Sequence, residues 1–156
     1  MTLEQPDSPA RRAVARRLVE EYARSLPIDL GFQDFGREIV SLADEYGPPR
    51  GHFALAVREG APVGCGGLRQ LSDAVCEMKR LYVVPAHRGA GVGRAIAGAL
   101  VNQARIIGYR TMMPDTLPVM ESAQALYAAL GFKPVSSYRY NPIPGASFWR
   151  LELDGD

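Results

Sequence analysis

A glycine-rich segment near the middle of the chain constrains the fold most strongly. It reads HRGAGVGR over residues 87–94 and joins a predicted strand, residues 76–85, to a predicted helix, residues 94–107. The first turn of a helix leaves its backbone N–H groups unpaired and carries partial positive charge, and glycine lets a ligand approach the main chain closely. We therefore expect this junction to bind a phosphate or a pyrophosphate.

Three kinds of glycine loop compete for this segment. A Walker P-loop ends in Gly-Lys-Ser/Thr, but here Gly93 is followed by Arg94. A dinucleotide-binding fingerprint, G-x-G-x-x-G, fails because its last position falls on Arg94 or Ile96. The pattern R-x-x-G-x-G fits residues 88–93. An ordinary glycine-rich turn in some other α/β phosphate-binding domain remains the alternative.

With this pattern the chain resembles the GNAT superfamily of N-acetyltransferases, whose coenzyme A pyrophosphate lies on the loop. The preceding EMKRLYVVP, residues 77–85, resembles the family's core strand, and AQALYAALGF, residues 123–132, resembles its A-x-x-L-Y-x-x-x-G-F segment. One departure is Met120, where many members carry asparagine. The resemblance implies an α/β (α+β) GNAT acyl-CoA N-acyltransferase fold, in which helices flank a mixed, mostly antiparallel sheet with a splayed central strand pair.

Composition limits the other classes of function. The 156 residues suit one domain over residues 1–156, and the net charge of +1 with interspersed charges argues against nucleic acid or a membrane surface as a partner. We find no long apolar run and no signal region, so we expect a cytoplasmic protein. We expect it to be either a monomer or a homodimer. Cys65 and Cys76 lie in apolar stretches and are expected to be reduced packing residues.

Local signals predict the elements on either side of the loop. Ser8 before Pro9 predicts the N-cap of a helix to about Ser25, with a second helix over residues 35–46. The dipeptide Glu59-Gly60 predicts a hairpin, and a doubtful first strand covers residues 2–5. The charged side chains of the first helix are expected to face solvent: Arg16, Arg17, Glu20, Glu21 and Arg24.

Further elements follow the same patterns. We expect strands at residues 76–84 and 109–114 and a helix at residues 118–130, with strand-like ends in the tail at residues 135–153. Strict alternation in strand 76–84 places Glu77, Lys79, Leu81 and Val83 on one face, unless a bulge shifts the phase. The resemblance implies such a bulge, with an adjoining cleft in which the pantetheine arm pairs with backbone groups.

The resemblance also implies the chemistry. An acetyl group would move from acetyl-CoA, as co-substrate, to a primary amine of a small molecule or peptide by direct attack through a tetrahedral intermediate. Glu77, eleven residues before Arg88, has the spacing of the catalytic glutamate in some histone-acetylating members; the alternative is a surface ion pair with Lys79. The backbone N–H near Leu81 would polarise the carbonyl, and Tyr127 would protonate the thiolate, unless it is only a core tyrosine.

The residues expected to bind the cofactor lie on the end of the strand, the loop and the start of the helix. They are Leu81, Tyr82, Val83, Arg88, Gly89, Ala90, Gly91, Val92, Gly93 and Arg94, with Tyr127 from a later helix. No metal is expected, because His52 and His87 do not form a ligand set with two isolated cysteines. A non-catalytic acyl-CoA-binding sensor or interaction module on the same fold is the alternative function.

Overall fold

The computed structural model describes residues 1–25, 42–116, 121–135 and 147–153. Met120 and most of the tail lie outside these residues, and the second predicted helix is described only at its end. The helices are α1 (Pro9–Ser25), α3 (Leu42–Glu45), α4 (Val92–Ile107) and α5 (Glu121–Ala129). The strands are β1 (Thr2–Glu4), β2 (His52–Arg58), β3 (Ala61–Gln70), β4 (Val75–Val83), β5 (Thr111–Met112), β6 (Asp115–Thr116), β7 (Lys133–Val135) and β8 (Ser147–Glu152).

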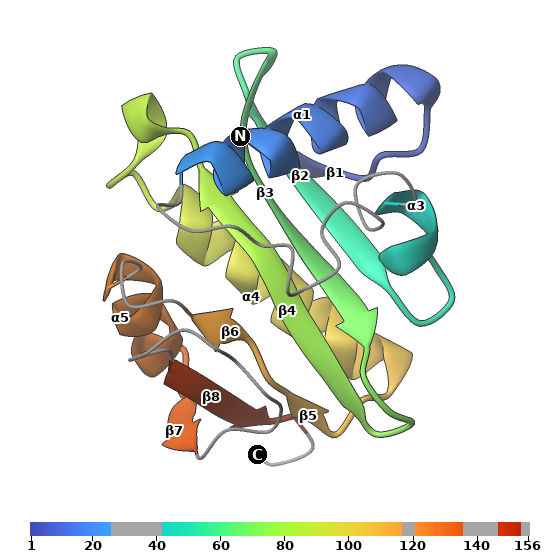
Figure 1. Ribbon diagram of the computed structural model, residues 1–156, viewed down its shortest axis with the longest axis vertical. Helices are drawn as coiled ribbons and strands as arrows, with labels where there is room; N and C mark the ends of the chain where they lie inside the picture. Colours follow the sequence, from blue (N-terminus) through green and yellow to red (C-terminus); the bar gives the residue numbers. More distant parts are fainter. Residues whose placement is uncertain (26–41, 117–120, 136–146, 154–156) are drawn as a thin grey trace.

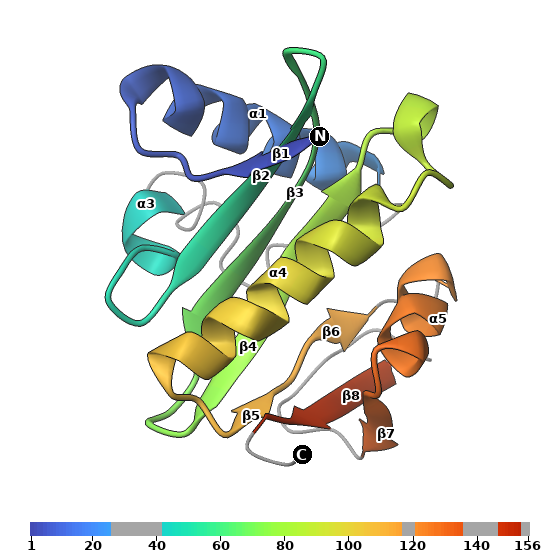
Figure 2. The ribbon, with the colours of Figure 1, turned by 180° about the vertical axis from the view of Figure 1, so that it is seen from behind.

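One mixed sheet organises the described residues. Its strands lie in the order β1-β2-β3-β4-β5-β8-β6, with β7 paired to β8. Only the β4–β5 pair is parallel; the other pairs are antiparallel. Helices α1 and α3 lie over one face (Figure 1), and α4 crosses the opposite face (Figure 2). The predicted fold class, a mixed and mostly antiparallel sheet flanked by helices, is confirmed.

Helix α1 begins at the predicted cap, since the Arg11 backbone N–H donates to Ser8 Oγ at 3.2 Å. It buries Ala15, Leu18, Val19 and Tyr22 against the sheet. One of its charged residues does not face solvent as expected. Glu21 is half-buried, and its carboxylate accepts a hydrogen bond from the Tyr82 hydroxyl at 2.6 Å. The reason is helical spacing, which puts residue 21 beside the buried Leu18.

The hairpin between β2 and β3 confirms the turn predicted at Glu59-Gly60. Both residues have positive φ, 53° and 78°, as a type I′ turn requires. The doubtful first strand is also present, because β1 pairs with β2 from Thr2↔Val57 to Glu4↔Leu55.

A bulge interrupts the pairing of β3 with β4. The register shifts between Cys65 and Gly67, and opposite this shift Arg80 has a φ of 60°. Before the bulge, Cys76 and Met78 point toward α4; after it, Leu81 does so, while Tyr82 joins the cluster under α1. Strict alternation is therefore wrong beyond Lys79, and Glu77 and Leu81 lie on opposite faces of the sheet.

Strands β4 and β5 separate soon after they meet. Their register covers only Val75↔Thr111 and Cys76↔Met112, with one further bond from the Met113 N–H to the Cys76 carbonyl oxygen. Beyond this point β6 pairs with β8 instead of β4. Within the described ranges, β3 is thus the only strand paired with the second half of β4, which confirms the splayed central pair.

Helix α4 packs closely because β3 presents glycines beneath it. A Cβ atom at Gly66 would lie 2.8 Å from Ile96 Cγ2, and one at Gly64 would lie 3.0 Å from Ile96 Cδ1 and 2.7 Å from the carbonyl oxygen of Tyr82 on β4. Helix α4 ends at Ile107, where its prediction also ends, and its C-cap Gly108 has a φ of 108°, a left-handed conformation that glycine adopts easily. Across the described part of the chain, no helix has the length and apolar character needed to cross a membrane.

We predict that Gly64→Ala lowers the free energy of unfolding by about 1–3 kcal/mol, because its new methyl group meets the β4 backbone. Urea denaturation measures the change. The matched control is Gly98→Ala in α4, where an added Cβ meets nothing within 4 Å. That variant should gain about 0.5–1 kcal/mol from helix propensity. Equal effects of the two substitutions would contradict the close approach.

Candidate functional site

The glycine loop leaves the end of β4 and opens α4. A short 3₁₀ turn, Pro85–His87, comes first, and Gly89 and Gly91 follow with φ of 83° and 85°. Gly91 is the N-cap of α4 and offers no side chain to cap the helix. The loop is solvent-exposed, and a Cβ at either glycine would meet nothing within 4 Å. The first backbone N–H groups of α4 are therefore open to an anionic ligand.

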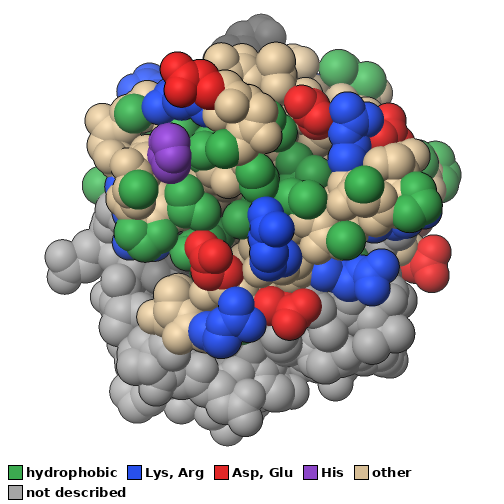
Figure 3. Space-filling model, turned by 90° about the horizontal axis from the view of Figure 1, so that it is seen from above, with side chains coloured by type: hydrophobic (Ala, Val, Ile, Leu, Met, Phe, Trp, Pro, Cys, Tyr) green, Lys and Arg blue, Asp and Glu red, His purple; other side chains and the backbone are tan. Residues whose placement is uncertain are grey.

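Arg88 ties this loop to the strand before it. Its Nε donates to the carbonyl oxygen of Val83 at 2.9 Å, and its guanidinium lies 5.7 Å from the centre of the Tyr82 ring. The fork of the guanidinium can still reach an anion above the loop, because only Nε is used in this bond. Figure 3 views the molecule from the end that carries the loop and shows basic and acidic side chains mixed around apolar ones. The features that suit an anion here are therefore the first N–H groups of α4 and the Arg88 guanidinium, and not a broad basic surface.

Helix α5 meets the loop beside the end of β4. A Cβ at Gly93 would lie 3.5 Å from Val83 and 3.8 Å from Leu126 of α5. The next residue, Tyr127, is 2% exposed, and its ring centre lies 5.4 Å from that of Phe132. Tyr127 belongs to the core cluster that also contains Leu81. The structure thus brings the expected acid and the expected carbonyl-binding residue to the same side of the sheet.

Glu77 lies on the other side, and it is buried, unlike the alternative of a surface ion pair with Lys79. It is 1% exposed, and its Oε1 lies 3.2 Å from Nε of Arg69, the residue directly opposite on β3. Nη1 of Arg69 lies 3.3 Å from Oε2 of Glu45 at the end of α3. One guanidinium therefore joins carboxylates from two elements. Sequence reasoning missed both Arg69 and Glu45. The contact of Arg69 with Glu77 depends on the β3–β4 register, and that with Glu45 depends on where α3 packs.

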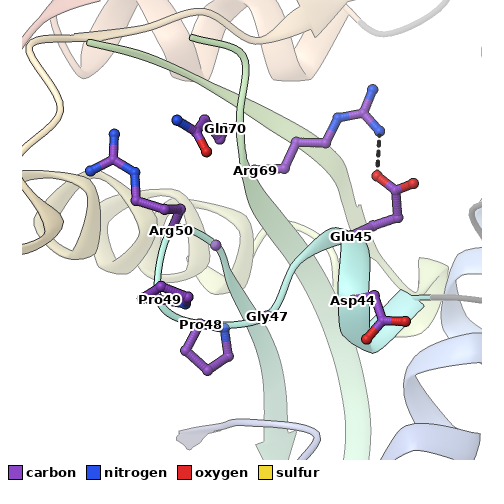
Figure 4. A pocket seen from close by; sticks show the side chains of 9 residues that line it. Asp44, Glu45, Gly47, Pro48, Pro49, Arg50, Arg69 and Gln70 are labelled. Carbon is purple, nitrogen blue, oxygen red and sulfur yellow. Dashed lines mark hydrogen bonds and ion pairs between the residues drawn. The ribbon is translucent and has the colours of Figure 1, made fainter. Parts of the chain in front are cut away.

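A pocket of about 430 Å³ adjoins this ion-pair network (Figure 4). It lies near the start of β4, whereas the glycine loop follows its end. In Figure 4 the side chains of Arg69 and Glu45 point toward one another at its edge. The lining residues are Asp44, Glu45, Gly47, Pro48, Pro49, Arg50, Gly51, Arg69 and Gln70.

Tyr82 is a neutral donor in this structure. Burial, and then its hydrogen bond to Glu21, raise the pKa of Tyr82 to about 12. It also packs edge-on against Tyr22 of α1, with ring centres 6.0 Å apart. These contacts hold the Tyr82 side chain against α1, directly before the glycine loop.

The two cysteines are free and buried, as expected. Burial raises the pKa of Cys76 to about 12, and its Sγ donates to the carbonyl oxygen of Thr111 at 3.6 Å. Burial also raises the pKa of Cys65. Neither thiol is ionised near neutral pH, so neither has the character of a nucleophile. No group of three or more metal-ligating side chains gathers among the described residues.

Comparisons with known proteins agree with this geometry. Residues 11–132 match the acetyltransferase (GNAT) family. An uncharacterized N-acetyltransferase of Schizosaccharomyces pombe is 36% identical over 140 residues, which cover 88% of this chain and 86% of that protein. A GNAT-family acetyltransferase of Staphylococcus aureus has a similar structure, with a TM-score of 0.81 at 17% identity, covering 97% of this chain and 98% of that one.

A Mycobacterium tuberculosis protein in complex with CoA also superimposes, with a TM-score of 0.74 at 20% identity, covering 98% of this chain and 99% of that one. At these identities the two solved structures show the shared fold alone.

We predict that neither thiol reacts with a disulfide reagent in the folded protein and that both react once urea unfolds it, because burial excludes the reagent and disfavours the thiolate. The absorbance of the released reagent measures the reaction. Cys65→Ala and Cys76→Ala variants assign each thiol. Rapid labelling of Cys76 in the native protein would contradict the burial described above.

Proposed function

This chain belongs to the acetyltransferase (GNAT) family, and from that premise we propose that it transfers the acetyl group of acetyl-CoA to a primary amine of a small molecule or peptide. The observation that carries the proposal is the exposed loop with Gly89 and Gly91 at the uncapped start of α4. Such a helix start suits a diphosphate. The CoA bound to the structurally similar M. tuberculosis protein supports this choice of ligand.

Acetyl-CoA would bind along the end of β4 and across the loop. Its diphosphate would accept hydrogen bonds from the first N–H groups of α4, with the Arg88 guanidinium beside it. The pantetheine arm would lie against β4 beyond Cys76, where β5 has turned away, and pair with backbone groups as an added strand does. The proposed binding residues are Leu81, Tyr82, Val83, Arg88, Gly89, Ala90, Gly91, Val92, Gly93, Arg94 and Tyr127.

Transfer would proceed by direct attack. The amine nitrogen bonds to the thioester carbon, and the oxygen that becomes negative accepts a hydrogen bond from the Leu81 backbone N–H. The C–S bond then breaks, and Tyr127 donates its proton to the departing thiolate. A phenol with a pKa near 10 gives its proton to a thiolate whose thiol has a pKa near 8.5, which is uphill by about 2 kcal/mol and is tolerated in a concerted step.

Glu77 would accept the proton that the amine loses, directly or through water. A lysine-like amine with a pKa near 10.4 is neutral in about one molecule in 2,500 at pH 7, so a base matters most for such an acceptor. The buried carboxylate beside Arg69 lies on the α1 side of the sheet, opposite Leu81. A screen of amines, amino acids and peptides for thiol release from acetyl-CoA tests the activity. CoA binding without release for any amine would favour a sensor instead.

We predict that Gly91→Asp raises the KM for acetyl-CoA about tenfold or more, because it adds strain at positive φ and a negative charge beside the diphosphate. Steady-state kinetics at varied acetyl-CoA measures it. Gly108→Asp is the matched control, since Gly108 also has positive φ and open space but caps the far end of α4. Equal KM values in the two variants would contradict the phosphate site.

We predict that Tyr127→Phe lowers kcat about a hundredfold while leaving KM for acetyl-CoA within about threefold, because the ring contact with Phe132 remains and the proton donor is lost. The matched control is Tyr109→Phe, another buried tyrosine, whose hydroxyl donates to the carbonyl oxygen of Arg50 at 2.7 Å. That control should lose stability but keep its turnover. Unchanged kcat in Tyr127→Phe would remove Tyr127 from the mechanism.

A further inference from the structure

Arg69 stands between the proposed base and the pocket. It lies on β3 directly opposite Glu77, and its side chain is 16% exposed. Nε contacts Oε1 of Glu77 at 3.2 Å, and Nη1 contacts Oε2 of Glu45 at 3.3 Å. The two contacts use different edges of one planar guanidinium, so Arg69 cannot rotate without losing one of them.

Because Glu77 is buried, its contact with Arg69 bears on whether its carboxylate is charged. A carboxylate that is 1% exposed has little contact with water, and burial alone favours its neutral form. A neutral carboxylic acid cannot accept a proton from an amine. A nearby guanidinium favours the charged form, and it also fixes the direction in which the carboxylate points.

We propose that Arg69 is the positioning residue of this site, which keeps Glu77 ionised and oriented while Glu45 anchors Arg69 at the edge of the pocket. This inference rests on the proposed function, because it assigns Arg69 a role toward the base of that reaction. Arg69 acts through Glu77 and makes no bond to the reacting atoms.

Other charged and titratable groups share this environment. Among the described residues they include Arg69 on β3, Glu45 and Asp44 on α3, Tyr46 just after α3, and the buried Lys79 and Arg80 on the same strand as Glu77. Cys76, adjacent in sequence, also feels the Glu77 charge, but burial keeps its thiol neutral. Arg69 contacts the Glu77 carboxylate at 3.2 Å, and Glu45 is the anion that shares its guanidinium.

The test follows Glu77 itself as well as the reaction. In protein labelled with ¹³C at the glutamate carboxyl carbons, pH titration by NMR reports the protonation of Glu77, which is assigned by its loss in Glu77→Gln. Arg69→Gln removes the charge but can still donate a hydrogen bond, and it should move the Glu77 titration to higher pH by about one unit or more. The acidic limb of kcat/KM should move in the same direction, with recovery toward wild-type values at higher pH.

Two further variants sharpen the result. Glu45→Gln removes the anion that competes for Arg69, so it should move the Glu77 titration to lower pH, the opposite direction. Arg69→Lys keeps a positive charge and should restore most of the wild-type profile. Arg11→Met is the matched control, since Arg11 also joins two carboxylates, Glu4 and Asp7, but at an exposed site near the N-terminus. It should leave the titration and the profile unchanged.

The outcomes separate this inference from the proposed function. A Glu77 titration that is the same in wild type, Arg69→Gln and Glu45→Gln would overturn the role of Arg69. If Arg69→Gln does not fold, the direction of the shift in Glu45→Gln decides. Absence of thiol release from acetyl-CoA in wild type would instead contradict the proposed function, and the NMR titration would still report on Arg69.

Discussion

The separation of β4 from β5 is the constraint on which the rest of the structure depends. A parallel pair that continued past Cys76 would satisfy the backbone of β4 on both edges and leave no place for an extended ligand. After β5 the chain instead continues into β6, which pairs with β8 and not with β4. Because the glycine loop begins where β4 ends, the open edge of β4 leads directly to the uncapped start of α4. The two features together define one continuous path for a long cofactor.

The bulge at Arg80 distributes the chemistry between the two faces of the sheet. In an unbroken strand Glu77 and Leu81 share a face. The single extra residue at the bulge turns Leu81 toward α4 and Tyr127, while Glu77 stays on the side of α3 and Arg69. The proposed proton acceptor, Glu77, and the proposed proton donor, Tyr127 of α5, therefore lie on opposite sides of the sheet.

Local signals in the sequence predicted much of this arrangement. The cap at Ser8, the turn at Glu59-Gly60 and the left-handed glycines around α4 depend on nearby residues alone, so they could be predicted without a tertiary structure. The contact of Glu21 with Tyr82 and that of Glu77 with Arg69 join different elements. They depend on the exact register and on helix placement. Strict alternation places Tyr82 on the wrong face, because the bulge reverses the side chains after it. The contact of Glu77 with Arg69 precedes the bulge and depends on which residues of β3 and β4 are paired.

The buried Glu77 on β4 and the partly buried Arg69 on β3 are costly for the fold. Removing a charged group from water costs up to several kcal/mol, and apolar residues of similar volume often serve the fold as well or better. The face of β4 around Glu77 borders an apolar cluster with Tyr46, Phe53 and Leu55, which apolar side chains could simply extend. Stability alone therefore does not account for Glu77 and Arg69. The proposed requirement for a carboxylate that is shielded from water yet remains charged would account for both residues, and for the contact of Arg69 with Glu45.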